Sequence, residues 1–102
     1  MKLRHCTPRR NLESIRQHGL LLSYAQCRPI SIWLHAKSKT PGIKLHVAKR
    51  HAVAAEEIVT IEVSIPRSWL RKSRWRGLYH IEKDVPPDRI HAVVDEVADL
   101  PW

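Results

Sequence analysis

Glycine is scarce in this sequence, and its scarcity excludes several nucleotide-binding motifs. The 102 residues include three glycines. A glycine-rich phosphate loop or a dinucleotide-binding fingerprint needs closely spaced glycines, because the backbone must approach the phosphates. The Gly-x-Ser-x-Gly turn that presents a serine nucleophile is missing as well. Backbone cradles for a pyrophosphate are therefore scarce in this chain.

Cysteine is also scarce, and the spacing of potential metal ligands does not define a zinc site. Cys6 and Cys27 are the two cysteines, and they form no Cys-x2-Cys pair. The seven histidines include no His-x3-His pair, and His46 and His51 are too far apart in sequence to share one helix face well. A thiol nucleophile at Cys6 beside His5 is disfavoured, because adjacent strand residues point to opposite faces. The sequence predicts no bound metal.

Long apolar runs are missing too. No stretch approaches the ~20 apolar residues that a bilayer-spanning helix requires, and the opening residues 1–5 lack the apolar run of an export signal. We therefore expect no membrane association and a cytoplasmic location, where both cysteines are reduced. A disulfide between the two cysteines is the alternative.

Acidic residues are almost absent from the first half of the chain. Residues 1–50 hold eleven Lys and Arg against one acid, Glu13, whereas residues 51–102 hold seven against nine. This asymmetry predicts a positively charged face rather than evenly spread charge. Nucleic acid or another polyanion is the partner that such a face would fit. A basic surface without a particular partner is the alternative.

Length and hydrophobic patterning predict one compact α+β domain spanning residues 1–102. The length matches a single domain, and the order strand, helix, strand, helix, then mostly strands favours a mixed or mostly antiparallel sheet with two helices. The segment 43–55 alternates like a strand, but its length and alanines favour a helix. We expect strands at 2–6, 29–35, 58–65, 78–83 and 91–94, helices at 7–19 and 43–55, and turns at 38–42 and 84–90.

The residues His5-Cys6-Thr7 lie where the first strand is expected to meet the first helix. Thr7 can cap that helix, Pro8 suits its first position, and Gly19 can end it. The start of a helix offers N–H groups to an anion or to ribose hydroxyls, and His5 can hydrogen-bond to either. The alternative is that His5 and Thr7 only terminate the strand and cap the helix.

A second constellation is a basic stretch that contains two tryptophans. It consists of Arg67, Trp69, Arg71, Lys72, Arg74, Trp75 and Arg76. Positive charge gives sequence-independent affinity for phosphates, and tryptophan faces stack on exposed bases. These residues are therefore candidate nucleic-acid contacts. The alternative is that the tryptophans fill the core while the arginines remain solvated.

Several short runs, in their order along the chain, resemble small ADP-ribosyltransferase-like domains. Together they cover about half of the chain, and each is weak alone. The nearest likeness is to short bacterial proteins that share the run PRSWLR at 66–71. The resembling runs are LRHCT at 3–7, NLESI at 11–15, HGL at 18–20, IWLH at 32–35, GLYHI at 77–81 and DVPPDRI at 84–90.

The resemblance implies an ADP-ribosyltransferase-like fold and a site for NAD or another phosphorylated ribose. In active members of the family the first-strand histidine binds a ribose hydroxyl, which assigns this role to His5 with Thr7 beside it. An aromatic residue near the second strand stacks on nicotinamide, and Trp33 is the matching candidate unless it is a core residue. Arg4 or Arg28 would neutralise the phosphates.

The family's catalytic glutamate has no clear counterpart here. It stands at the start of the late strand, where this sequence has Leu78, and Glu82 four residues later is the nearest substitute. Three readings follow: a variant transferase with Glu82 in a catalytic role, a phosphate-directed enzyme without that glutamate, or a non-catalytic nucleic-acid-binding module. Recognition by a partner protein through the acidic end at 95–102 is a further alternative.

Overall fold

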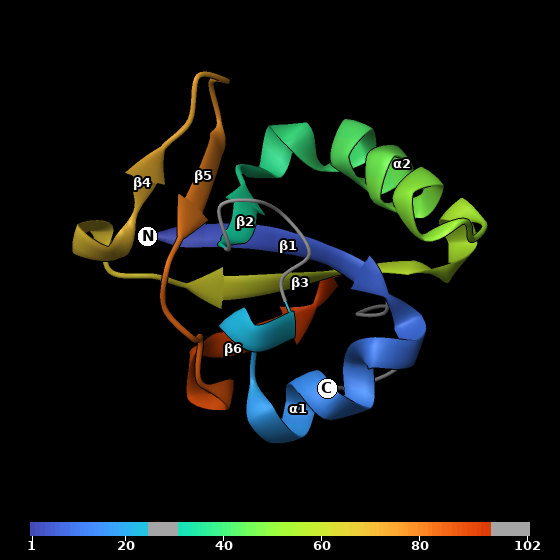
Figure 1. The fold of residues 1–102 in the computed structure, drawn as a ribbon, viewed down its shortest axis with the longest axis horizontal. Helices are drawn as coiled ribbons and strands as arrows, with labels where there is room; N and C mark the ends of the chain where they lie inside the picture. Colours follow the sequence, from blue (N-terminus) through green and yellow to red (C-terminus); the bar gives the residue numbers. More distant parts are fainter. Residues whose placement is uncertain (25–30, 95–102) are drawn as a thin grey trace.

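The computed structural model describes residues 1–24 and 31–94, which form one compact α+β domain with an antiparallel sheet (Figure 1). The sheet has six strands in the order β4-β5-β2-β1-β3-β6, and every neighbouring pair is antiparallel. The strands are β1 (Lys2–Pro8), β2 (Ile32–His35), β3 (Ile58–Ser64), β4 (Arg71–Lys72), β5 (Leu78–Ile81) and β6 (Ile90–Val93). The helices of the described residues are α1 (Leu12–His18) and α2 (Thr40–His51).

The predicted α+β class with two helices is confirmed, and the sheet is antiparallel rather than mixed within the described residues. β3 is built from the Ile58–Ser64 run, which is rich in β-branched residues. β1 lies at the centre and pairs with β3 along its whole length, from Lys2 opposite Ser64 to Pro8 opposite Ile58. Its register with β2, in contrast, consists of Arg4 opposite His35. The two strands are thus closely paired at one end of their contact only.

The two helices cover opposite faces of the sheet (Figure 1). Because strand side chains alternate between faces, Leu3 and Ile61 join the main core with Leu12 and Ile15 of α1. On the other face Cys6 and Ile58 pack against Ala48 of α2. His5 and Thr7 therefore share the α1 face of β1 with Leu3, whereas Arg4 and Cys6 belong to the α2 face.

Gly19 ends α1, as the sequence predicts. Its φ is 80° and its ψ is −165°, a conformation outside the left-handed helical region that is essentially restricted to glycine. The Gly19 N–H donates to the carbonyl oxygen of Ile15 at 2.8 Å. The chain then joins the loop after β5, where Leu20 and Val85 exchange two backbone hydrogen bonds of 2.9 and 2.8 Å.

The predicted start of the first helix is wrong. Thr7 and Pro8 continue β1 because both keep pairing with β3, opposite Val59 and Ile58. A 3-10 turn, Arg9–Asn11, comes between the strand and α1, and α1 has no side-chain cap. The helix start that the sequence predicted beside His5 is therefore not there. A ligand near His5 would be bound by side chains instead.

The second helix begins earlier than predicted. The 38–42 segment is not an isolated turn, because a 3-10 turn at Lys37–Lys39 leads into α2 and Pro41 lies in its first turn, where proline is tolerated. α2 ends at His51, and Ala52 adopts the left-handed conformation with a φ of 54°. The apolar residues that alternate at the start of the 43–55 segment are not all buried, since Leu45 is 64% exposed.

β2, β5, β6 and the 84–90 turn lie near their predicted positions, whereas β4 was not predicted. Residues 29 and 30 of the predicted strand 29–35 lie outside the described residues. β2, β5 and β6 are shorter than or shifted from the expected ranges by a few residues, and the 84–90 turn contains a 3-10 helix at Pro87–Arg89. Within the part of the chain described, no helix combines the length and apolar character needed to cross a bilayer.

Candidate functional site

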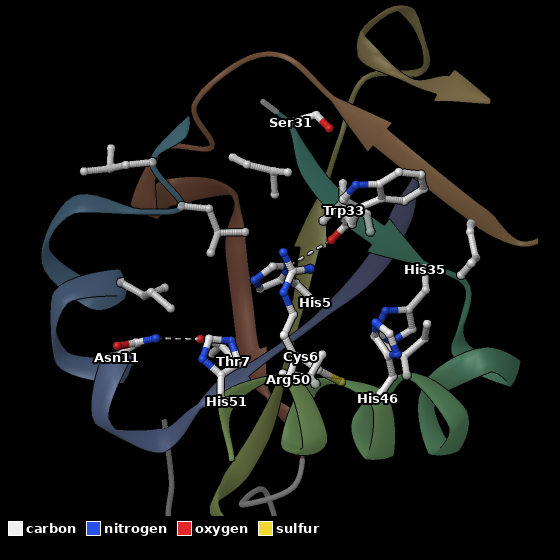
Figure 2. Close-up of a pocket in the computed structure, with 18 of the residues that line it drawn as sticks. His5, Cys6, Thr7, Asn11, Ser31, Trp33, His35, His46, Arg50 and His51 are labelled. Atoms are coloured by element: carbon white, nitrogen blue, oxygen red, sulfur yellow. Dashed lines mark hydrogen bonds between the residues drawn. The ribbon is translucent and has the colours of Figure 1, made fainter. Parts of the chain in front are cut away.

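A cavity of about 800 Å³ opens beside the short contact between β1 and β2. It is lined by His5–Thr7 of β1, by Ile32–His35 of β2, and by side chains of α1 and α2 (Figure 2). His5 belongs to the α1 face of the sheet and His35 to the α2 face, so the cavity spans both faces where the two strands separate. The centre of the sheet thus carries the candidate site.

His5 takes part in the contact between the two strands through its side chain. Its Nδ1 lies 2.9 Å from the carbonyl oxygen of Trp33. A carbonyl oxygen can only accept, so Nδ1 carries the proton and donates this hydrogen bond. Burial lowers the pKa of His5, and the hydrogen bond to Trp33 opposes that shift. The ring is then neutral near pH 7, and its Nε2 is left as a hydrogen-bond acceptor suited to a ligand hydroxyl.

One lobe of the cavity is strongly basic. The α2 residues Arg50 and His51 line this lobe together with Thr7 and Asn11 (Figure 2). Arg10 also lines the cavity. The pKa of His51 is lowered by burial and by the nearby charges of Arg10 and Arg50. Asn11 Nδ2 donates to Thr7 Oγ1 at 3.1 Å, which leaves the hydroxyl hydrogen of Thr7 for another acceptor.

The lining of the cavity includes no Asp or Glu among the described residues. Two arginines and several hydroxyl and amide groups face the same space without a carboxylate to neutralise them. Such a site favours an anionic ligand, because a phosphate would satisfy both the positive charge and the hydrogen-bond donors.

His35 forms a second, deeper part of the lining. It is 2% exposed, and its Nε2 has no hydrogen-bond partner among the described residues. Burial lowers its pKa to about 4, and the charges of His5 and Arg4 add to the shift. His46 projects from α2 into the same part of the cavity (Figure 2). A buried imidazole nitrogen without a partner is available for a ligand atom.

Two tryptophans stand at the cavity's open side. Trp33 is 36% exposed, so the interpretation as a core tryptophan does not hold. Its ring centroid lies 5.0 Å from that of His80 and 6.4 Å from that of Trp75, which meets it edge to face. Trp33 and Trp75 both line the cavity and can contact a planar ligand there.

The structure does not bring Arg4 or Glu82 into this cavity. Arg4 lies on the opposite face of β1 from His5, where its Nη2 is 3.9 Å from Glu62 Oε2. Glu82 follows the end of β5 and is exposed outside the lining, whereas Leu78 lines the cavity. Neither the predicted phosphate contact, Arg4, nor the predicted catalytic residue, Glu82, therefore lines this cavity. Arg28 and the acidic end at 95–102 lie outside the described residues.

The basic stretch is divided between two environments. Trp69 is half-buried against the main core, and the side chains of Lys83 and Arg89 lie over its ring at 5.3 and 5.0 Å. Trp75 is exposed at the cavity. The basic residues of the stretch are all exposed: Arg67, Arg71, Lys72, Arg74 and Arg76.

Sequence reasoning missed much of the basic and histidine lining. It did not assign Arg10, His35, His46, Arg50 or His51 to the site. The spacing of His46 and Arg50, four residues apart on one helix, was the available signal, since such residues share a helix face. Nothing local in the sequence indicated that this face of α2 meets β1.

Comparison of this chain with protein-family models and with curated protein sequences finds no match. Within residues 1–24 and 31–94, no group of three or more His, Cys, Asp or Glu side chains is arranged to hold a metal ion.

Proposed function

We propose that this chain is an ADP-ribosyltransferase-like domain that binds NAD or another phosphorylated ribose in the cavity between β1 and β2. The observation that carries this proposal is the position of His5, a neutral histidine that lines a basic cavity while its Nδ1 is hydrogen-bonded to the Trp33 carbonyl oxygen. The volume of about 800 Å³ lies within the range of small-ligand sites, ~300–1,000 Å³.

The lining supports a division of roles. His5 Nε2 accepts a hydrogen bond from a ribose hydroxyl, as the sequence resemblance implies for this position. Arg10 and Arg50 neutralise the phosphates, taking the part that the sequence assigned to Arg4 and Arg28. Trp33 stacks on a nicotinamide or adenine ring, for which its exposed face at the cavity is available.

The same lining does not favour glutamate-assisted transfer. The position that matches the family's glutamate is Leu78, which lines the cavity with an apolar side chain. Without a carboxylate nearby, these residues offer no negative charge to stabilise a ribosyl cation. We therefore propose nucleotide binding as the function, and transfer chemistry only if the acceptor or another part of the chain supplies the missing group.

Binding measurements test this proposal directly. We expect isothermal titration calorimetry to detect binding of NAD or ADP-ribose to the wild-type protein. His5→Ala and Arg50→Ala should each weaken it tenfold or more, because a hydrogen bond to a charged or buried group contributes ~1.5–3 kcal/mol. The Arg50 effect should disappear with nicotinamide riboside, which lacks phosphate, whereas the His5 effect should persist.

Matched controls come from exposed residues outside the cavity. His91→Ala on β6 removes a histidine, and Lys49→Ala removes a charge one residue before Arg50. Both are expected to bind like the wild type. Absence of binding in the wild type at millimolar ligand, or equal losses in the controls, would contradict the proposal.

A further inference from the structure

Trp75 is an exposed tryptophan held in a fixed turn. It is 56% exposed, although large aromatic rings are usually buried. Ser73 Oγ accepts from the Trp75 N–H at 3.1 Å and lies 2.9 Å from the carbonyl oxygens of both Trp75 and Leu78. The Leu78 N–H donates a hydrogen bond of 3.2 Å to the Trp75 carbonyl oxygen, which closes the turn. The ring is thus presented to solvent by an ordered backbone rather than by a loose loop.

Trp75 also has an aromatic neighbour and a cationic one. Trp33 meets it edge to face at 6.4 Å, and the Arg74 guanidinium lies 5.4 Å from its ring centroid. In an edge-to-face pair the edge of one ring points at a face of the other, and the 56% exposure of Trp75 leaves part of its ring surface open to solvent. A base that stacks on the open face of Trp75 would complete a sandwich with Arg74 on the other side.

The segment around Trp75 is uniformly basic. No acidic residue occurs between Glu62 and Glu82. β4 and β5 pair as a hairpin, with Arg71 opposite His80 and Lys72 opposite Tyr79. The hairpin therefore carries the exposed cations Arg71, Lys72, Arg74 and Arg76.

We propose that this hairpin and the Trp33–Trp75 pair bind single-stranded nucleic acid. The exposed cations contact successive phosphates, and Trp75 stacks on one unpaired base. An exposed aromatic face next to clustered positive charge is the combination that single strands require. A duplex hides its base faces, and an acidic peptide has no base to stack, so neither uses both features. The inference goes beyond nucleotide binding in the cavity and does not depend on it.

Fluorescence anisotropy with a labelled twelve-nucleotide oligoadenylate RNA tests the inference. We expect the wild-type protein to bind this RNA, or DNA of the same sequence, more tightly than a duplex of equal length. Trp75→Ala should weaken binding about fivefold or more, from ~1–3 kcal/mol per stacked base, and Trp75→Phe should restore part of the loss. Leu45→Ala, which truncates an exposed apolar residue of α2, should have no effect.

The charges have a separate readout. For single strands each phosphate contact contributes ~−0.7 to the slope of log K against log salt. Arg74→Ala with Arg76→Ala should therefore flatten the slope by about 1.4. The matched double variant Lys49→Ala with Lys83→Ala removes two charges elsewhere and should leave the slope unchanged.

Three results would overturn the inference: no RNA or DNA binding at low salt, equal affinity for duplex with no effect of Trp75→Ala, or preferential binding to vesicles containing phosphatidylserine. The outcome is distinguishable from that of the proposed function. His5→Ala should keep its affinity for oligonucleotide, and the Arg74/Arg76 double variant should keep its affinity for ADP-ribose. If the wild-type protein fails to bind either ADP-ribose or the oligonucleotide, only the proposal for that ligand is contradicted.

Discussion

Replacing Gly19 with alanine is expected to destabilise the domain by about 3 kcal/mol or more. A Cβ at this position would lie 1.9 Å from the carbonyl oxygen of Val85, which is far inside van der Waals contact. That oxygen accepts the Leu20 N–H, so it cannot move without breaking the link between α1 and the loop after β5. The φ of 80° adds backbone strain for any residue with a side chain.

Gly42 provides a matched control for this substitution. It lies in α2, and a Cβ there would meet nothing within 4 Å. Gly42→Ala is expected to stabilise the domain by about 0.5–1 kcal/mol through helix propensity. Urea unfolding followed by circular dichroism gives both values. A free energy of unfolding for Gly19→Ala within 1 kcal/mol of the wild type would show that the Val85 contact relaxes easily.

Acidification from pH 6.5 to 4 is expected to cost the domain about 3 kcal/mol through His35 alone. The pKa of His35 is lowered to about 4 in the folded protein, against about 6.5 in the unfolded chain. Between these values the unfolded state binds a proton that the folded state does not, so stability falls as pH falls. About one pH unit or more above 6.5 the ring is neutral in both states, and the full stability is present.

The surroundings of His35 determine the sign of this effect. Burial disfavours the protonated ring most, and the nearby positive charges of His5 and Arg4 add to the effect. His46 of α2 shares its part of the cavity. The pKa of His5 is lowered as well, so its titration adds in the same direction. Among the described lining residues there is no carboxylate to stabilise the protonated ring.

Comparing variants isolates the contribution of His35. His35→Gln keeps a polar side chain that does not titrate, so it should lose less stability than the wild type between pH 7 and pH 4.5. His91→Gln changes an exposed residue of β6 and should follow the wild type, because carboxylate protonation affects all three proteins equally. Urea midpoints at several pH values measure the difference. Parallel pH profiles for wild type and His35→Gln would argue against a neutral, buried His35.

The fold was accessible from sequence where the pattern was local and strong. The β-branched run of β3 and the glycine after α1 each specify their structure through short-range physics. Thr7 was misassigned because its capping propensity competes with pairing to Val59, which only the folded sheet supplies. The lengths of β2 and β5 likewise depend on their partners rather than on their own residues.

The candidate site was only partly accessible for a related reason. His5, Thr7 and Trp33 were identified from sequence, and they do line one cavity. Arg10 and Arg50 join them from separate elements, a convergence that no short motif encodes. The sequence also could not tell Trp69 from Trp75. Both stand among arginines, yet one packs on the core and the other is exposed.

The central position of β1 has a consequence for how the chain folds during synthesis. β1 is translated before the other strands, whereas its partner β3 is translated much later. The two strands pair from Lys2 opposite Ser64 to Pro8 opposite Ile58. These contacts are distant in sequence, and forming them requires closing long loops, which slows folding. The sheet cannot assemble around β1 until Ser64 has left the ribosome. Until then the strand that carries His5 is an unprotected edge, exposed to mispairing or to capture by a chaperone.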